Sequence, residues 1–229
     1  MNMKLIRFSV VMLIFFCLSS TLVEAQDWAN FGRYDQANLK VKAPLKKEHR
    51  VVFMGNSIFD KWRTYDGEYF INNPYIDRGI SGQVTSQMLI RFRPDVINLN
   101  PEVVVILAGT NDIAQNQGPI SLEKIAGNIF SMIELARANK IKVVLCSLLP
   151  ANKYSWNPKV KPADLIVKLN GMLKTYAKKH KVAYVDLYNL MVDDEKGLRE
   201  DYRRNALHPN KNGYKVMGVA IDKAIKKVI

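Results

Sequence analysis

The sequence predicts an α/β fold in which helices cover both faces of a five-stranded parallel β-sheet. Five short runs are almost continuously apolar and rich in β-branched residues, which is typical of parallel strands buried on both faces. Segments with a helical period lie between the later runs, and this alternation implies right-handed crossovers and a three-layer sandwich. The five predicted strands are Arg50–Met54, Tyr75–Ile80, Val103–Ala108, Val143–Leu149 and Val182–Leu187.

Three segments are predicted to be amphipathic helices, because their apolar residues recur at intervals of three or four. The first follows Ser121, a candidate N-cap, and the last closes the chain after Asn212-Gly213. The methionines in these segments are interpreted as core residues. The three apolar stripes are Leu122, Ile125, Ile129, Met132 and Ala136; Leu165, Leu169, Met172 or Leu173, and Tyr176; and Tyr214, Met217, Ile221, Ala224 and Val228.

Length and composition indicate one globular domain. The chain has 229 residues, of which 48% are apolar and 24% charged, and these values are ordinary for a folded protein. Its net charge is +13, which suits either a solvated basic surface or attraction to anionic polymers and membrane surfaces. The lysines form no dense run, which favours the solvated surface. No nucleic-acid-binding motif is present, so we expect no nucleic-acid partner.

The N-terminus has the pattern of a signal peptide. Lys4 and Arg7 precede an apolar run over residues 8–18, and small residues lead to Ala25. We expect residues 1–25 to be cleaved near Ala25 and the protein to be periplasmic or extracellular, without stable membrane insertion. A transmembrane anchor is the alternative, but a span needs ~20 apolar residues.

The two cysteines are predicted to form no disulfide in the mature chain. Cys17 lies inside the predicted signal peptide, and lipid attachment there is disfavoured because Phe15 and Phe16 occupy positions where that processing requires small residues. Cys146 lies in an apolar run and is interpreted as a small buried hydrophobic residue without a chemical role.

Residues 26–49 are predicted to form a polar N-terminal arm. It contains three aromatic residues, Trp28, Phe31 and Tyr34. These rings either pack the arm onto the body of the protein or line a pocket.

One serine and one histidine stand out as a candidate nucleophile and base. Ser57 comes just after the first predicted strand, and His208 lies in a polar loop before Pro209. A serine hydroxyl needs a base to attack a carbonyl, and imidazole is the usual one. The other two histidines, His49 and His180, lie in charged segments and are expected at the surface. The alternative for Ser57 is that it only caps the next helix.

Two further residues fit the need for an oxyanion hole, in which hydrogen-bond donors stabilise the charge of the tetrahedral intermediate. Gly82 follows the second strand and can present its backbone N–H closely because it has no side chain. Asn111 follows the third strand and can present its side-chain amide. Parallel strands place their carboxyl ends at one crevice, which would bring both residues near Ser57. Taken singly, they could also be a turn glycine and a loop asparagine.

These four residues stand in motifs that resemble the GDSL-type, or SGNH, hydrolase family, whose four blocks carry Ser, Gly, Asn and His. The likeness covers residues 50–229, which we assign as the hydrolase domain, and the most similar members are small bacterial acylhydrolases akin to platelet-activating-factor acetylhydrolase subunits and sugar acetylesterases. The four blocks are Gly55-Asn56-Ser57, Gly82, Gly109-Thr110-Asn111-Asp112 and Asn205-Ala206-Leu207-His208-Pro209.

The resemblance implies a flavodoxin-like sheet with strand order 2-1-3-4-5 and an acyl-serine mechanism without a metal or cofactor. Ser57 would attack, His208 would relay the proton, and water would release the acid. The backbone N–H of Ser57 would join Gly82 and Asn111 in the oxyanion hole.

The sequence departs from the family pattern at two positions. Asn56 replaces the aspartate of the first block, where we expect a modest effect. Asn205 replaces the aspartate that would orient His208. The amide oxygen of Asn205 could accept the imidazole N–H in place of a carboxylate. Carboxylates of the preceding loop are alternative partners: Asp193, Asp194 and Asp201.

One segment after the fourth strand bears on the choice of substrate. Tyr154 and Trp156 lie on a segment after the fourth strand that is long enough to overhang the site. Their rings either bind sugars or pack the segment down. Export and a compact site favour short acyl esters, such as acetyl groups on carbohydrate. Lysophospholipids and other lipid esters are the alternative substrates. A protein that binds glycans or lipids without turnover is a further alternative, supported by Asn205.

Overall fold

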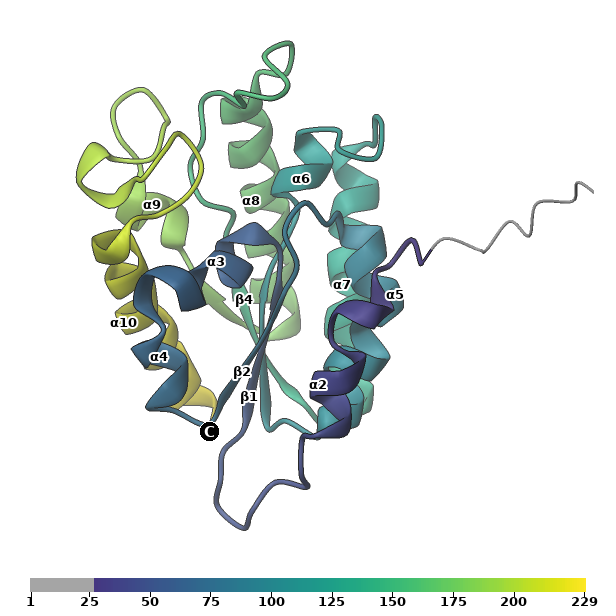
Figure 1. Cartoon of the computed structure of the whole chain (residues 1–229). Helices are drawn as coiled ribbons and strands as arrows, with labels where there is room; N and C mark the ends of the chain where they lie inside the picture. Colours follow the sequence, from purple (N-terminus) through teal and green to yellow (C-terminus); the bar gives the residue numbers. More distant parts are fainter. Residues whose placement is uncertain (1–26) are drawn as a thin grey trace, which may run out of the picture.

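The computed structural model describes residues 27–229 (Figure 1). The predicted signal peptide, its cleavage near Ala25 and Cys17 lie outside the described residues. Within the described part of the chain, no helix is both long and apolar enough to cross a membrane.

The five predicted strands form one parallel sheet with the order β2-β1-β3-β4-β5, which confirms the fold class and the strand order. Gly55 pairs with Gly79 on one side and with Leu107 on the other, so the three strands that precede the candidate site end level with one another. Their bounds are β1 Val51–Gly55, β2 Tyr75–Gly79, β3 Val103–Leu107, β4 Lys142–Cys146 and β5 Ala183–Val185.

Helices cover both faces of the sheet, and the sheet separates two apolar cores. One face carries α5 Thr85–Asp95, α7 Leu122–Ala138 and α8 Pro162–His180. The other carries α3 Ser57–Asp66, α4 Glu68–Ile71, α9 Leu187–Met191 and α10 Lys211–Val228. The remaining short elements are η1 Phe31–Arg33, α2 Asp35–Leu39, η2 Ile97–Leu99, α6 Thr110–Ile113 and η3 Glu200–Tyr202.

Strands β2 and β3 end one residue before the predicted position, β4 ends three residues before it and β5 two. Side chains explain the two larger differences. After β4, the backbone N–H and C=O of Leu148 bond to the side-chain amide of Asn170 at 2.8 and 3.2 Å, instead of to a neighbouring strand. After β5, the Asp186 carboxylate accepts the N–H of Asn189 at 3.2 Å and begins α9 as its N-cap. Of the predicted strand Val182–Leu187, only Ala183–Val185 is therefore strand.

The N-terminal arm packs along the edge strand β2 and the start of α5. Tyr34 is buried, its hydroxyl donates to the carbonyl of Gly79, and the Arg78 guanidinium lies 4.6 Å from its ring centroid. Trp28 and Phe31 are 44% and 37% exposed. Of the three aromatic residues expected to pack the arm, only Tyr34 does so with its ring buried.

Cys146 is buried at the end of β4, as predicted. Burial raises the pKa of its thiol well above the usual range, so its thiolate is not available for chemistry.

Candidate active site

Ser57 is the first residue of α3, which begins directly after β1. The helix is capped by its neighbour, because Oδ1 of Asn56 accepts the N–H of Ile58 at 3.0 Å. The alternative in which Ser57 caps the helix is therefore wrong. An asparagine caps as well as an aspartate, which fits the modest effect expected at this position.

His208 contacts Ser57 across 151 residues of sequence, with 3.0 Å between Nε2 and Oγ. The loop before α10 brings the imidazole to this position. Its turn is closed by the N–H of Arg204, which donates to the carbonyl of His208 at 2.9 Å. Asn210 then caps α10 by accepting the N–H of Gly213 at 3.0 Å, two residues before the Asn212-Gly213 start that was expected.

Asn205 holds the other side of the imidazole. Its Oδ1 lies 3.2 Å from Nδ1 of His208 and also accepts the backbone N–H groups of Leu207 and His208 at 3.0 and 2.8 Å. The two backbone donors require an oxygen at this position, so the amide orientation follows from the hydrogen bonds. The same oxygen then accepts from Nδ1, which leaves Nε2 free to accept the Ser57 proton.

The nearby carboxylates take no part in this arrangement. Asp201 forms an ion pair with Arg199 at 2.9 Å, and Asp193 accepts the backbone N–H groups of the loop at Glu195 and Gly197. Asp194 is exposed to solvent.

The electrostatic environment lowers the pKa of His208. Burial is the main cause, and the positive charges of Arg204 and Lys61 add to it. The imidazole is therefore neutral at neutral pH, which is the form that can accept a proton.

Gly82 lies in the loop after β2 with a φ of +81°, a conformation that glycine adopts without strain. A Cβ at this position would meet no atom within 4 Å. Within the protein, the backbone conformation is what favours glycine here. Close approach of its backbone N–H to a substrate oxygen stays a prediction. Ser81 fixes this loop to α3 by donating its N–H and its hydroxyl to the carboxylate of Asp60.

Asn111 lies on α6 and is buried beside the Gly82 loop, where its Nδ2 donates one N–H to the carbonyl of Gln83 at 2.9 Å. Its neighbour Asp112 accepts the N–H of Thr85 at 3.0 Å and its hydroxyl at 2.6 Å. Burial raises the pKa of Asp112. This pair joins the third motif to the start of α5, so the loops after β2 and β3 form one unit.

Tyr154 and Trp156 have different positions. Tyr154 is buried and donates its hydroxyl to the carbonyl of Thr110 at 3.2 Å. It therefore packs its segment against the body of the protein, and the expectation that it contacts substrate is wrong. Trp156 is 49% exposed, and its indole N–H donates to Oδ1 of Asn116 at 2.9 Å. Nδ2 of Asn116 donates in turn to the carbonyl of Gly82 at 3.2 Å.

Sequence reasoning missed Gln83 and Asn116, which organise this region, and assigned no role to Asp112, although that residue stands in the third motif. Their positions, next to Gly82 or within five residues of Asn111, are the only signal that the sequence offers. The hydrogen bonds that give them a role join separate loops.

Comparison with known proteins identifies the family of the chain. A family model described as "GDSL-like Lipase/Acylhydrolase family" matches residues 53–216. An acetylxylan esterase from Xylanibacter ruminicola is 29% identical over 152 residues, which cover 58% of this chain and 30% of that protein. A platelet-activating factor acetylhydrolase IB subunit beta homolog from Drosophila melanogaster is 26% identical over 134 residues, covering 56% of this chain and 57% of that protein. The chain spans only 30% to 57% of the length of its curated relatives.

Solved structures match over most of the chain. A GDSL-like lipase from Bacteroides thetaiotaomicron is 47% identical with a TM-score of 0.86, and covers 88% of this chain and 99% of that one. A Bacteroides fragilis protein classed as an acylhydrolase is 49% identical with a TM-score of 0.87, and covers 88% of this chain and 98% of that one. By fold, motifs and family match, this chain belongs to the GDSL-like lipase/acylhydrolase family.

Proposed function

We propose that the protein is an exported serine esterase that removes short acyl groups, above all acetyl groups on carbohydrate, through an acyl-Ser57 intermediate. The observation that carries this proposal is the line of contacts from Ser57 Oγ to His208 Nε2 at 3.0 Å and from His208 Nδ1 to Asn205 Oδ1 at 3.2 Å. It has the order of nucleophile, base and orienting group that acyl transfer requires. The domain is residues 50–229, preceded by the arm over 26–49.

In the first half of the reaction, Oγ of Ser57 attacks the ester carbonyl while Nε2 of His208 accepts its proton. The imidazolium then gives this proton to the leaving alcohol, and the C–O bond of the ester breaks. In the second half, water attacks the acyl-serine and His208 accepts and returns a proton in the same way. Acid is released and Ser57 recovers its hydroxyl.

Three donors are assigned to the tetrahedral oxyanion. Ser57 is in the first turn of α3, where backbone N–H groups have no acceptor within the helix. Gly82 lies beside open space, and Asn111 uses one of its two amide protons on Gln83, which leaves the other for a ligand. Preorganised donors of this kind are the largest single contribution in many acyl-transfer sites.

The exposed face of Trp156 supports a carbohydrate substrate. Its indole N–H is bonded to Asn116, which also bonds to the Gly82 carbonyl, so the ring is fixed two hydrogen bonds away from the proposed oxyanion hole. Such a face suits the apolar side of a sugar ring. The acetylxylan esterase relative supports the same class. Lysophospholipids and other lipid esters remain the alternative, supported by the net charge of +13.

The test is hydrolysis of 4-nitrophenyl acetate by the purified mature chain beside Ser57→Ala between pH 6 and 9. We expect activity that the variant abolishes. A series of nitrophenyl esters from acetate to decanoate tests the acyl length, and a maximum at long chains would replace the acetylesterase proposal by the lipid-esterase alternative. Export is tested by locating the processed chain and sequencing its N-terminus, where cleavage after Ala25 is expected.

The neutral orienting group leaves a second candidate, a glycan- or lipid-binding protein without turnover. Covalent labelling of Ser57 by a fluorophosphonate separates the two. Labelling of the wild type but not of Ser57→Ala supports the esterase, whereas glycan binding without labelling supports the binding protein.

A further inference from the structure

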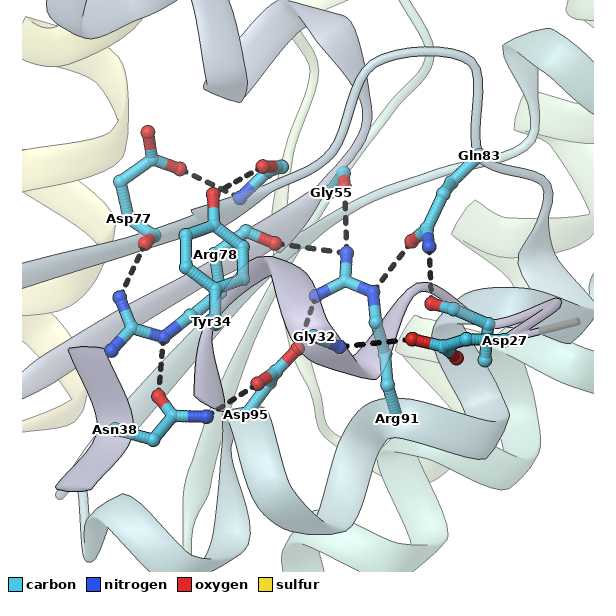
Figure 2. Close-up of polar contacts among 12 residues, drawn as sticks. Asp27, Gly32, Tyr34, Asn38, Gly55, Asp77, Arg78, Gln83, Arg91 and Asp95 are labelled. Carbon is cyan, nitrogen blue, oxygen red and sulfur yellow. Dashed lines mark hydrogen bonds and ion pairs between the residues drawn. The ribbon is translucent and has the colours of Figure 1, made fainter. Parts of the chain in front are cut away.

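A fully buried arginine lies behind the proposed oxyanion hole. Arg91 is on α5, its side chain is 0% exposed, and its guanidinium pairs with Asp95 at 2.8 Å one helical turn later (Figure 2). Burial lowers its pKa, and the carboxylate of Asp95 opposes this effect. A buried charge must be paired and hydrogen-bonded to be tolerated. The other hydrogen-bond partners of the Arg91 guanidinium indicate what this residue holds in place.

These partners belong to the two chain segments that carry the proposed nucleophile and oxyanion donor. Nη2 of Arg91 donates to the carbonyl of Gly55 at 3.2 Å, two residues before Ser57, and Nε donates to Oε1 of Gln83 at 2.5 Å, the residue after Gly82. In Figure 2 the guanidinium lies between these groups. One planar group therefore sets the spacing between the end of β1 and the loop after β2.

Gln83 is held from three directions. Its side-chain oxygen accepts from Arg91, its Nε2 donates to the carbonyl of Ala29 in the N-terminal arm at 2.7 Å, and its backbone carbonyl accepts from Asn111 at 2.9 Å. The peptide next to Gly82 is thus fixed to both the arm and the third motif.

The arm also closes the far side of this network. Nδ2 of Asn38 donates to Asp95 at 2.7 Å, and its Oδ1 accepts from Nε of Arg78 at 2.9 Å (Figure 2). Nη2 of Arg91 donates to the carbonyl of Arg78 at 2.9 Å. The arm therefore covers a continuous polar network that would otherwise face water.

We propose that Arg91 is a positioning residue for the esterase: through Gly55 and Gln83 it fixes the Gly82 loop relative to Ser57, with the N-terminal arm as the cover of this network. The inference rests on the proposed function, because it concerns the geometry in which Gly82 would meet an oxyanion. Oxyanion donors act through preorganisation, so a loosened loop lowers kcat more than it changes KM.

The chain offers a matched control in Arg50, which is also buried but lies at the opposite end of β1. Its guanidinium donates to the carbonyl of Leu99 at 2.7 Å and to Glu48 at 2.8 Å. Arg91→Lys and Arg50→Lys both keep the charge and lose the planar fork of donors. Gln83→Leu removes the link without replacing any charged residue, although Nε of Arg91 loses its acceptor.

The experiment compares Tm, kcat and KM for 4-nitrophenyl acetate in these three variants, with Ser57→Ala to show that turnover depends on the serine. We expect Arg91→Lys and Gln83→Leu to lower kcat about tenfold or more with KM changed less than threefold, and Arg50→Lys to keep kcat within twofold at a similar loss of Tm. Equal kcat in the Arg91 and Arg50 variants would overturn the inference while Ser57-dependent turnover upholds the esterase.

Amide hydrogen exchange of residues 80–84 tests the positioning role of Arg91 even if the wild type shows no turnover. Faster exchange in Arg91→Lys than in Arg50→Lys is expected, because only the former releases the loop. Unchanged exchange in Arg91→Lys would overturn the positioning role independently of the proposed function.

Discussion

Oδ1 of Asn205 lies 3.2 Å from Nδ1 of His208 and is fixed in place by two backbone N–H groups of its own turn. In a serine protease, changing the orienting aspartate to asparagine lowers turnover about 10⁴-fold because the wrong imidazole tautomer results. Here the amide presents its oxygen, so the tautomer is the one that catalysis requires. In the proposed mechanism, Asn205 would supply orientation but no negative charge for the imidazolium.

Substitution at Asn205 tests this division of roles. We expect Asn205→Asp to change kcat less than tenfold, since the tautomer is already correct, whereas Asn205→Ala should lower kcat by about 10²-fold because the imidazole loses its acceptor. Both are measured with 4-nitrophenyl acetate. A gain above tenfold in Asn205→Asp would show that the native site is impaired.

The pH dependence follows from the lowered pKa of His208. A base must be unprotonated to act, so kcat/KM should rise through an acid limb whose midpoint lies below the usual histidine value of about 6.5. Arg204→Gln removes one of the positive charges that lower this pKa, and Asn205→Asp adds a negative charge near Nδ1. Both variants should therefore move the acid limb to higher pH. An acid limb with the same midpoint in wild type and in both variants would contradict the electrostatic cause of the lowered His208 pKa.

Trp156 should matter for carbohydrate and not for a small activated ester. Covering roughly 40 Å² of its ring with a sugar is worth about 1 kcal/mol, or about fivefold in KM. We expect Trp156→Ala to raise KM for acetylated xylo-oligosaccharides by this amount and to leave 4-nitrophenyl acetate unaffected. Trp156→Phe keeps an aromatic face and serves as the control. A KM that is the same in wild type and Trp156→Ala would remove the ring from the substrate site.

Asp77 should reduce stability at neutral and alkaline pH. Its carboxyl is buried, and burial raises its pKa to about 6. The folded state thus holds its proton more tightly than the unfolded state, so this contribution to stability is present at low pH and lost as pH rises through about 6. Oδ1 of Asp77 accepts the N–H of Gly79 at 2.7 Å, and the amide oxygen of an asparagine at the same position would still accept it.

We therefore expect Asp77→Asn to increase the free energy of unfolding by about 2 kcal/mol at pH 8 and by much less at pH 4. Urea unfolding at both pH values measures this difference, with the exposed carboxylate of Asp194 replaced by asparagine as the control. An equal increase in the free energy of unfolding at pH 4 and pH 8 would contradict the raised pKa of Asp77 as the cause.

The sheet and the positions of the four motifs could be predicted because they depend on local patterns. A buried parallel strand needs a continuous apolar run, and the topology of a parallel sheet forces the following loops to one edge. Ser57 was predicted from its position after the first strand, and His208 because the other two histidines lie in charged segments. The structure places Oγ of Ser57 3.0 Å from Nε2 of His208.

What could not be predicted depends on contacts between distant segments. The segment Arg91 to Asp95 contains two arginines, a proline and an aspartate, and in sequence this looks like a solvated surface rather than a buried network. Tyr154 and Trp156 are two residues apart and chemically alike, yet only the structure shows that one is buried and the other exposed. The orientation of Asn205 depends on backbone donors in a turn that no pattern specifies.

The separation of 151 residues between Ser57 and His208 has a consequence for biosynthesis. The serine, its strand and both loops of the proposed oxyanion hole leave the ribosome well before the histidine does, and α10, which anchors the histidine loop, is made after all of them. If the proposed mechanism holds, a nascent chain that ends before residue 208 has a serine without its base and would be inactive. Onset of esterolysis in a translation reaction would therefore time the docking of α10, and the enzyme would act as its own reporter of this folding step.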